Sequence, residues 1–587
     1  MVHEIYHNYP PPLTPEQEEY LVQTVKNWSI EHALAVRPSS AIVSEEANPN
    51  HVLATNAPVT LFPSPFSKSC FDQARSLQKT YNELYAAIAS DEEWLERVME
   101  ELFEVDDFLA NLWKIHLAVK EEGYVQNMSL GLFRSDYMLD APDDSRGPPS
   151  LKQVEFNTIS SSFGGLASLV TEMHTHLATY PSQGHPVAYP RHPLFGNSPD
   201  KLPSIKSIGH PPHNTAVPTL TAGLAAAHEA YGSSKSRPSL PTCILFLVQD
   251  TERNIFDQLA LSTHLYKEHK IPSFRLPTSK ILALTSIPRT DTNRARPLIY
   301  TPPSSPSIQY EVTVVYFRAL YAPSEYDGPT SWAARHHLER SAAIKCPSIL
   351  LHLSGSKKVQ QVLTSRPPGP DHLKFFLPDH PTAALDKLRS TFAPQYALSP
   401  TPESSDSANP DTNTETKTDT DTDTDTDTDT KTDTEHEDIE SEGIRLALSE
   451  TTAANHVLKP QREGGGNNIY RTNIPPFLNS IPRSQWKQYI LMELIRPPPA
   501  AKNTVLRSDG HVVHGNVVSE LGIFGTCLWR NTPIHGASGS GSGSKRPKIL
   551  HNTEGGFLLR TKGKENDEGG VAAGFSSLDS LILYEES

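Results

Sequence analysis

The sequence has little cysteine, no long apolar run and no concentration of positive charge, and each absence excludes a class of protein. Its four cysteines, Cys70, Cys243, Cys346 and Cys527, lie far apart in 587 residues, which argues against a disulfide framework and against a zinc site. No apolar stretch approaches the roughly 20 residues that span a bilayer, and no charged leader precedes an apolar segment at the N-terminus. We therefore expect a soluble protein of a reducing compartment, the cytosol, with no membrane partner.

The formal net charge of -16 is concentrated in one segment. Residues 401–442 hold sixteen acids and two lysines, a net of -14, so that the rest of the chain carries -2. Lysine and arginine are dispersed and outnumbered, which argues against a nucleic-acid partner. Within the acidic segment, Thr418–Thr430 alternates Thr and Asp without interruption. Six like charges with almost no apolar area predict disorder there.

The length of the chain exceeds what one hydrophobic core normally supports, so we expect two or more packed units with long insertions. Many of the 51 prolines gather in stretches such as residues 190–218, which predict surface loops. The Gly- and Ser-rich segment 536–548 predicts a flexible loop.

About the first 130 residues have helical periodicity. Thr14, Pro15 and Gln17 form the start of a capping box. A second helix start, at Ser90–Glu93, precedes an apolar stripe from Trp94 to Leu112. This stripe predicts a buried helix face and implies no chemistry.

From about residue 151 the pattern changes to short strands. Residues 151–160 alternate, and Gly164 and Gly165 then permit a tight turn before an apolar helical segment. Further along, strands are predicted at 243–249, 271–276 and 311–321, with a helix at 257–269 between the first two. Residues 240–335 are therefore expected to form a small α/β domain of their own.

The stretch "VLKPQREGGGNNIY", residues 457–470, is the first candidate for chemistry. Three consecutive glycines leave backbone amides free to close on an anion, and Lys459 is a mobile charge suited to phosphate. The spacing fits neither a P-loop nor the G-x-G-x-x-G fingerprint. A run of glycines alone is more often a flexible surface turn, but Glu463, Asn467 and Asn468 supply the oxygens that Mg²⁺ prefers and so weaken that alternative.

A second carboxylate and amide pair lies in "QVEFNTISSSFGG". Glu155 and Asn157 are two residues apart in a predicted strand, so they share a face and could hold one hard cation. The alternative is an ordinary solvated strand face. Ser160 and Ser162 could bind a substrate carboxylate or could satisfy turn amides.

Further polar residues follow the predicted strands. Glu252, Asn254 and Gln258 come after a strand that is buried on both faces, where open α/β sheets bind ligands. Arginines suit a bidentate grip on carboxylates, although each one alone is more often a surface ion pair. The arginine and tyrosine candidates are Arg134, Arg318 and Tyr321.

Three later stretches add candidates. Residues 490–495 form an apolar strand that could offer its backbone to a purine edge or could simply be core. The segments 520–525 and 558–574 contribute Glu520, Arg560 and Lys562 and a second glycine-rich turn.

Taken in order, these stretches resemble eukaryotic glutathione synthetase, of the ATP-grasp superfamily. The resemblance spans residues 130–575 and rests on nine blocks, which are "QVEFNTISSSFGGLAS", "ERNIFDQ", "VVYFR", "IKCP", "KKVQQ", "VLKPQREGGGNNIY", "ILMELI", "ELGIFG" and "LLRTK…GGVAAG". It implies an α/β (α+β) ATP-grasp fold with a small inserted α/β substrate domain, a glycine-rich lid and a homodimer. The implied domains are residues 1–239, the N-terminal helical region and first part of the ATP-grasp body; residues 240–335, the inserted domain; and residues 336–587, the remainder of the body with the lid.

The resemblance implies a ligase that joins γ-glutamylcysteine to glycine with cleavage of ATP, through an acyl phosphate, and that needs Mg²⁺. Such transfer depends on positioning and on neutralising the charge of phosphate oxygens. Two alternatives stay open: the same chemistry with β-alanine or serine as the amine acceptor, and a catalytically silent paralogue that acts as a binding protein.

The resemblance also assigns roles by position in the matching blocks. It implies Mg²⁺ ligands at Glu155, Asn157 and Glu463. It implies catalytic roles for Arg134, Arg560 and Lys459. It implies nucleotide contacts at Lys345, Lys459, Gly464, Gly465, Gly466, Asn467, Asn468, Tyr470, Met492, Glu493, Leu494, Ile495, Glu520, Lys562 and Glu568. It implies substrate contacts at Arg134, Ser160, Ser162, Glu252, Asn254, Gln258, Arg318, Tyr321, Arg560, Val571 and Ala572.

The sequence departs from the family pattern mainly by insertions, which interrupt no motif. Glu568 stands where many relatives have Asp, which leaves its nucleotide contact open, and Arg471 and Thr472 after the glycine loop are atypical.

Overall fold

The computed structural model describes residues 9–10, 12–141, 147–179, 206–207, 211–288, 295–365, 369–399, 441–498, 501–531, 546–565, 571 and 576–585. Within these ranges every helix is too short or too polar to cross a membrane. The segments 401–440 and 536–545, and with them the predicted disorder of Thr418–Thr430, lie outside the described residues.

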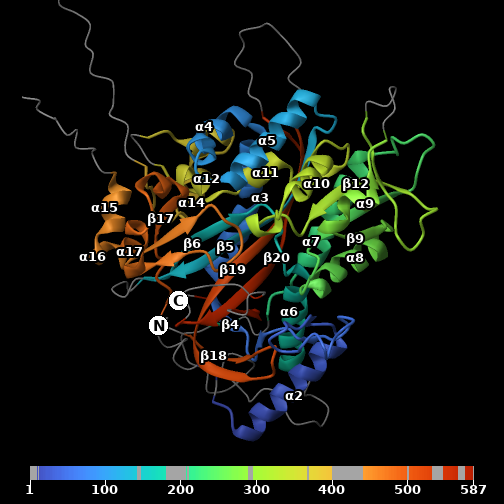
Figure 1. Cartoon of the computed structure of the whole chain (residues 1–587). Helices are drawn as coiled ribbons and strands as arrows, with labels where there is room; N and C mark the ends of the chain where they lie inside the picture. The colour runs from blue at the N-terminus through green and yellow to red at the C-terminus, as the bar shows by residue number, and fades with distance from the viewer. Residues whose placement is uncertain are drawn as a thin grey trace, which may run out of the picture.

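A large mixed sheet of thirteen strands runs through the centre of the molecule (Figure 1). Its strands are β3 (Val59–Thr60), β5 (Met128–Asp140), β6 (Ser150–Asn157), β8 (Thr242–Val248), β9 (Ser273–Pro277), β10 (Thr285–Ser286), β11 (Leu298–Tyr300), β12 (Tyr310–Phe317), β13 (Ile344–Cys346), β18 (Ala501–Leu506), β19 (Val512–Arg530), β20 (Lys548–Gly563) and β21 (Ser577–Asp579).

Part of this sheet closes on itself. Strand β19 pairs with both β18 and β20, and β3 and β21 complete the circuit between those two. One edge of β19 pairs with β20, while the other edge pairs first with β18 and then with β5, which also pairs with β6. The long strands β5, β19 and β20 therefore lie side by side at the centre, and side chains from all three reach one region.

Helices cover both faces of the large sheet, and each face has its own core. One face carries α3 (Lys68–Ser90), α4 (Glu92–Phe103), α5 (Asp107–Glu122), α9 (Ile281–Leu284), α10 (Pro329–Glu339), α11 (Ile349–Ser354), α12 (Lys357–Leu363), α13 (His372–Phe376) and α14 (Thr382–Arg389). The other carries α2 (Pro15–Glu31), α6 (Gly164–Thr179), α7 (Ala216–Tyr231) and α8 (Ile255–His269).

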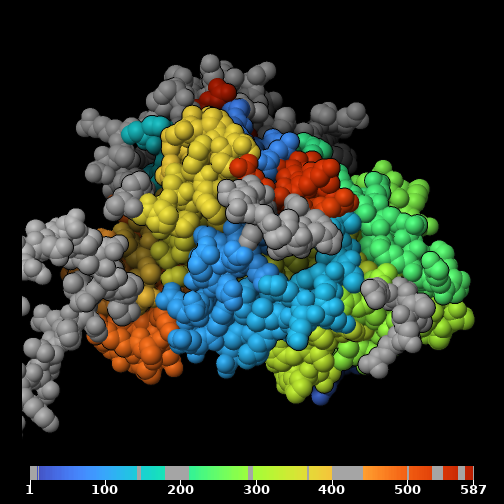
Figure 2. Space-filling model, turned by 90° about the horizontal axis from the view of Figure 1, so that it is seen from above, coloured from blue at the N-terminus to red at the C-terminus, as the bar shows by residue number. Residues whose placement is uncertain are grey.

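The first of these faces joins helices that are far apart in the sequence. Figure 2 shows the blue helices of residues 68–122 beside the yellow segment that contains residues 329–389. Strand β8 lies between the two cores, since Cys243, Leu245 and Leu247 face one of them while Ile244 and Phe246 face the other. The prediction of a strand buried on both faces at 243–249 is confirmed.

A second, antiparallel sheet carries its own helices and core. Its elements are β14 (Gln395–Ala397), β15 (His456–Pro460), β16 (Ile469–Tyr470), β17 (Tyr489–Glu493), α15 (Glu442–Leu448), α16 (Glu450–Ala453) and α17 (Ile474–Asn479). Figure 1 shows the elements from α15 to β17 in orange beside the large sheet. We call this part the lid sheet, and residues 459–470, which run from the end of β15 through β16, the lid loop.

The remaining short elements form two small sheets and single turns. They are β1 (Ala35–Val36), β2 (Thr55–Asn56), β4 (Ser64–Ser67), β7 (Lys206–Ser207), β22 (Leu581–Glu585), η1 (Thr278–Lys280), η2 (Pro323–Glu325), η3 (Arg471–Asn473) and η4 (Arg483–Gln488).

The N-terminal helices agree with the predictions only in part. The capping box at Thr14 is present and begins α2. Residues 35–67, in contrast, contribute four short strands, which are too brief to show a period of two. The second helix start is capped by Asp91 rather than Ser90, and the predicted stripe is divided between α4 and α5, where Asp106 caps the second helix.

The predicted turn at Gly164 and Gly165 is wrong in its details. Both glycines already belong to α6, and a Cβ on Gly165 would lie 2.8 Å from Cβ of Ala260, so this glycine serves close packing against α8. Ser160 and Phe163 turn the chain instead, with positive φ angles of 52° and 72°. The backbone between β6 and α6 therefore has the kind of strain that is found at functional sites.

The strands predicted within residues 240–335 are β8, β9 and β12, with α8 between the first two. They pair into the large sheet through β13, which adjoins β5. The domain boundaries proposed from the sequence stay a prediction.

Gly556 provides a test of the packing between β20 and α7. Its φ is +81°, and a Cβ there would lie 2.2 Å from the backbone N of Ala216, which cannot move like a side chain. We expect Gly556→Ala to lower the free energy of unfolding by more than about 2 kcal/mol. Gly515→Ala, on the exposed part of β19 with no atom within 4 Å of its Cβ, is the control. Equal denaturation midpoints for the two variants would contradict this packing.

Candidate active site

One cavity of about 670 Å³ is lined by residues of both the large sheet and the lid sheet. Most of the candidate residues from the sequence line it. They are Arg134, Glu155, Asn157, Ser160, Ser162, Glu252, Asn254, Arg318, Tyr321, Lys459, Glu463, Gly464, Gly465, Asn467, Asn468, Tyr470, Met492, Glu493, Leu494, Ile495, Glu520, Arg560, Lys562 and Val571. Segments separated by more than 400 residues therefore share one pocket.

A few candidates lie elsewhere. Lys345, Gln258 and Gly466 are not part of the cavity lining. Lys345 is buried in β13, where its Nζ donates to the backbone O of Ser341 at 2.9 Å and burial lowers its pKa to about 8. Glu568 and Ala572 lie outside the described residues.

Strand register explains how the central candidates meet. Arg134 on β5 is opposite Asn157 on β6, and Glu520 on β19 is opposite Arg560 on β20. Residues opposite each other in antiparallel strands have their Cβ atoms about 4.5–5.5 Å apart. The pairing of four strands thus brings a carboxylate, an amide and two guanidinium groups together.

Asp136 holds these groups in place and was not among the predicted residues. This carboxylate is fully buried, and it accepts from Arg134 Nε at 2.6 Å and Nη2 at 2.8 Å, from Arg560 Nη2 at 3.0 Å and from Asn157 Nδ2 at 2.9 Å. Gly522 lies opposite Asp136 on β19, and a Cβ there would lie 2.6 Å from Cδ of Arg134. A side chain at that position would exclude the arginine.

The amide of Asn157 is fixed in orientation. Its Nδ2 donates both to Asp136 and to the backbone O of Arg134, the latter at 3.1 Å. Because both amide hydrogens are used, Oδ1 is directed away from those acceptors and is available as a ligand.

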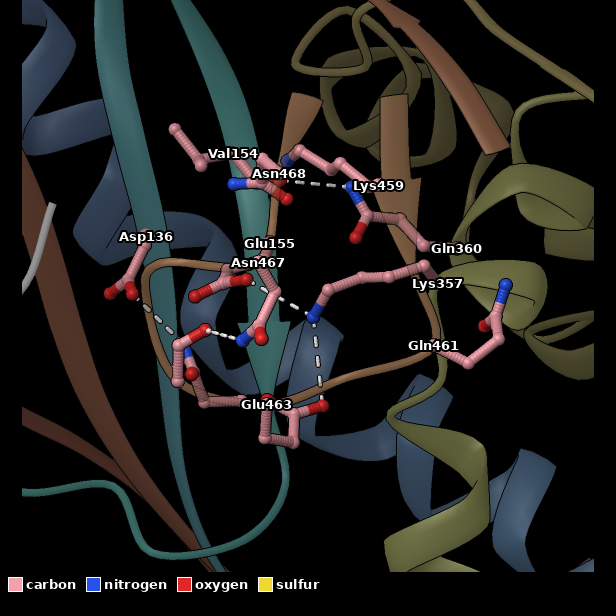
Figure 3. A network of polar contacts seen from close by, with 12 residues as sticks. Asp136, Val154, Glu155, Lys357, Gln360, Lys459, Gln461, Glu463, Asn467 and Asn468 are labelled. Carbon is pink, nitrogen blue, oxygen red and sulfur yellow. Dashed lines mark hydrogen bonds and ion pairs between the residues drawn. The ribbon is translucent and has the colours of Figure 1, made fainter. Parts of the chain in front are cut away.

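A lysine that was not predicted bridges the two carboxylates that were. Nζ of Lys357, at the start of α12, lies 3.1 Å from Oε2 of Glu155 and 3.6 Å from Oε1 of Glu463 (Figure 3). Burial alone would raise the pKa of Glu155, but the charges of Lys357 and then Lys459 lower it to about 2. Burial raises the pKa of Glu463, against the opposing effect of Lys357.

The other charged groups are also perturbed by burial. Lys459 donates to the backbone O of Val154 at 3.0 Å, and burial lowers its pKa to about 8. Burial raises the pKa of Glu520, which forms an ion pair with Arg560. The strong perturbation of several groups in one cavity is characteristic of functional sites.

The lid loop contributes Gly464, Gly465, Asn467 and Asn468 to the cavity lining. Gly464 and Gly466 have φ angles of +81° and +93°, which other residues rarely adopt. Asn467 Nδ2 donates to the backbone O of Gly464 at 3.3 Å, and Asn468 Nδ2 donates to the Tyr470 hydroxyl at 3.1 Å. The loop therefore turns twice where two of the three glycines lie.

The strand predicted at residues 490–495 is β17 together with the two residues that follow it, and Met492–Ile495 line the cavity. The backbone N of Glu493 donates to Pro394 O at 3.0 Å, and that of Leu494 donates to Asn455 O at 2.8 Å. These two N–H groups are used within the protein, so a purine edge would have to meet other backbone groups of this stretch.

The residues predicted for the dipeptide form two groups of hydrogen bonds, one around Glu252 and one around Tyr321. Glu252 accepts from the backbone N of Asn254 at 2.8 Å and from Nε2 of Gln258. Gln258 thus supports Glu252 although it does not line the cavity itself. The Tyr321 hydroxyl accepts from Gln249 Nε2 at 3.1 Å.

Arg318 is held by a second buried carboxylate. Its Nη2 donates to Oδ2 of Asp257 at 2.9 Å. Asp257 also accepts from the backbone N of Gly165 at 2.7 Å and of Phe163 at 3.0 Å, so it joins α8 to the strained turn before α6.

Comparisons with known proteins show the family to which the chain belongs. The family model described as eukaryotic glutathione synthase, ATP binding domain, matches residues 15–583. The chain belongs to the eukaryotic glutathione synthase family. The glutathione synthetase large chain of Schizosaccharomyces pombe is 34% identical over 97% of this chain and 99% of its own, and human glutathione synthetase is 33% identical over 96% and 97%.

A solved structure shows the same fold. A glutathione synthetase-like effector from Globodera pallida, in its apo form, matches with a TM-score of 0.63 and 18% identity, over 97% of this chain and 98% of that one. The predicted ATP-grasp α/β fold is confirmed. As a member of the glutathione synthase family the chain is an ATP-dependent ligase, which the sequence resemblance had implied.

Several charged residues in or beside this cavity were not predicted from the sequence. Asp136 follows Arg134 by two residues and so shares its strand face, which is a signal that could have found it. Lys357 opens the quoted block "KKVQQ" but gave no local sign of its partners. Asp257 and Arg462, which forms an ion pair with Asp106, gave none either.

Substitution of Asp136 tests the geometry of the site. Asp136→Asn removes the charge of the carboxylate that Arg134 and Arg560 share, and only Arg560 keeps a second carboxylate partner, Glu520. Loss of one partner of a buried pair destabilises by about 3–5 kcal/mol. Asp140→Asn, at the half-buried end of β5, is the control, because Asp140 accepts only from the backbone N of Arg496 among its described hydrogen bonds. Chemical denaturation of both variants checks this. A loss in Asp136→Asn no larger than in the control would contradict the central role of Asp136.

Proposed function

We propose that this ligase joins γ-glutamylcysteine to glycine and cleaves ATP to ADP and phosphate, with an acyl phosphate as intermediate. The observation that carries the proposal is the convergence, in one cavity, of Lys459, Glu463, Arg134 and Arg560 from both sheets. Cations and amides from both sheets line the same cavity as Glu252 and Asn254, as expected for a triphosphate beside a peptide.

In the first step, a carboxylate oxygen of the cysteinyl residue attacks the γ-phosphorus of ATP, and the bond from that phosphorus to the bridging oxygen of ADP breaks. Arg134 and Arg560 hold the carboxylate, and Lys459 balances the charge on the phosphate oxygens. Because Asp136 fixes both guanidinium groups before substrate arrives, little reorganisation is needed at the moment of reaction.

In the second step, the amine of glycine attacks the acyl carbon, the bond from carbon to the phosphate oxygen breaks, and the amine loses a proton. Water would compete for the same carbon. We infer that the lid loop closes over the cavity and excludes water, with Gly464 and Gly466 as the points where its backbone bends.

The donor set fits Mg²⁺. Among the described residues no three His, Cys, Asp or Glu side chains form a metal site, but Glu155 and Glu463 already share a cation, the Lys357 ammonium, and Asn157 presents an oriented amide oxygen. We propose that Glu155, Asn157 and Glu463 hold the ion. When bound, Mg²⁺ would neutralise and orient phosphate oxygens.

Several finer features are proposed by family resemblance. They are a homodimer, a cytosolic location, Met492–Ile495 along the adenine, Glu520 and Lys562 at the nucleotide, and Val571 near the acceptor. One relative, from Solanum lycopersicum, is named as chloroplastic, so location varies among family members. The reported relatives favour glycine over β-alanine or serine, and they disfavour a silent paralogue.

The reaction is tested with purified protein, ATP, Mg²⁺ and γ-glutamylcysteine. We expect rapid phosphate release with formation of glutathione when glycine is added, and slow release with β-alanine, serine or no amine. Mass spectrometry of the product identifies the acceptor. ATP cleavage with no tripeptide from any amine would overturn the proposal.

Substitution of Glu463 tests the proposed Mg²⁺ ligands Glu155, Asn157 and Glu463. Glu463→Gln removes one carboxylate ligand, so we expect a higher Mg²⁺ concentration for half-maximal activity, by about tenfold or more. Glu450→Gln, at the exposed first residue of α16, is the control. An unchanged Mg²⁺ titration in Glu463→Gln would remove this ligand from the set.

A further inference from the structure

Lys357 is a buried cation with an unusual pair of neighbours. Its residue is 4% exposed, and its ammonium lies within 3.6 Å of both Glu155 and Glu463, the two carboxylates of the proposed metal set (Figure 3). The carboxylates come from different parts of the fold, since Glu155 is on β6 of the large sheet and Glu463 is in the lid loop. The ammonium is thus a contact between the large sheet and the lid loop.

The position of Lys357 is fixed by the helix that carries it. Ser356 caps the start of α12. The backbone N of Lys358 donates to Oε1 of Gln461, which directly precedes the turn of the lid loop, at 2.9 Å, and Nε2 of Gln360 donates to the backbone O of Val154 at 3.2 Å. The same helix turn therefore touches β6 on one side and the lid loop on the other.

The charges explain why a cation is needed at this point. Two carboxylates that are buried next to each other repel. The loss of hydration also destabilises each of them unless a positive group neutralises it. Lys459 and Arg560 lie on the Glu155 side, while Lys357 is the described cation that forms an ion pair with Glu463. Without Lys357, Glu463 would lose its ion-pair link to Glu155 on β6.

We propose that Lys357 is a positioning residue that holds Glu155 and Glu463 together before the metal binds and yields their oxygens to the arriving ion. The proposal rests on the Mg²⁺ assignment made above. The ammonium keeps the carboxylates of the two sheets within reach of one ion, and because it competes with that ion it prevents tight binding of Mg²⁺ in the absence of nucleotide.

The bridge is tested first without any metal. In EDTA, Lys357→Met is expected to lower the melting temperature by about 3 °C or more. Adding Glu463→Gln to that variant removes the repulsion and should restore at least half of the loss. Should the single variant not fold, recovery of folded protein in the double variant is the expected result. A double variant no more stable than Lys357→Met would overturn the bridge.

The competition is tested with Mg²⁺ alone, followed by thermal shift. Because a competing charge is removed, Lys357→Met should reach its half-maximal shift at a Mg²⁺ concentration lower by about tenfold or more than the wild type. Loss of packing alone would not increase the response to the ion. An equal or weaker response of Lys357→Met would overturn the competition.

The neighbouring lysine is a matched control. Lys358 is on the same helix turn, but its Nζ forms an ion pair with Glu101 of α4, away from the metal set. Lys358→Met should respond to Mg²⁺ as the wild type does. If Mg²⁺ with ATP shifts none of these proteins, the metal assignment and the competition both fail, while the metal-free measurements still decide whether Lys357 bridges the carboxylates.

Discussion

The site depends on one buried carboxylate, Asp136, which accepts hydrogen bonds from Arg134, Arg560 and Asn157. A charge without solvent is tolerated only when it is paired and hydrogen-bonded, so this carboxylate requires the side chains around it as much as they require it. Those side chains come from β5, β6 and β20. The interaction that stabilises the middle of the large sheet therefore also orients the groups that would meet a substrate carboxylate and phosphate.

The rest of the proposed chemistry is divided between two sheets. Glu155 and Asn157 belong to the large sheet, while Lys459 and Glu463 belong to the lid sheet and its loop. A metal and a triphosphate between them would draw both parts together, so binding of substrate and closure of the lid loop are expected to be coupled. Lys357 has the same effect on a smaller scale before ligands bind, because its ammonium contacts a carboxylate from each part.

Much of this could be predicted from the sequence because the relevant signals are local. The alternation that gives β6, the apolar run of β8 and the glycines of the lid loop each specify a conformation within a few residues. The family resemblance ordered these segments, and most of the residues it assigned line one cavity. Their individual roles stay predictions.

What could not be predicted are contacts between segments far apart in the chain. Nothing near Lys357 in the sequence indicates that Glu155 and Glu463 lie beside it. The need for glycine at position 522 is likewise seen only in the structure, where a Cβ would collide with Arg134. The short strands were missed for a different reason. The strands between residues 35 and 67 are two to four residues long, so that pairing partners rather than periodicity determine them.

The most direct measurement is a crystal structure with Mg²⁺, a non-hydrolysable ATP analogue and γ-glutamylcysteine. The account predicts an ion bound by Glu155, Asn157 and Glu463, a γ-phosphate between Lys459 and Arg560, and the cysteinyl carboxylate next to Arg134 and Arg560, with Asp136 still holding both arginines. A nucleotide bound outside this cavity, or a metal bound without these three ligands, would contradict it.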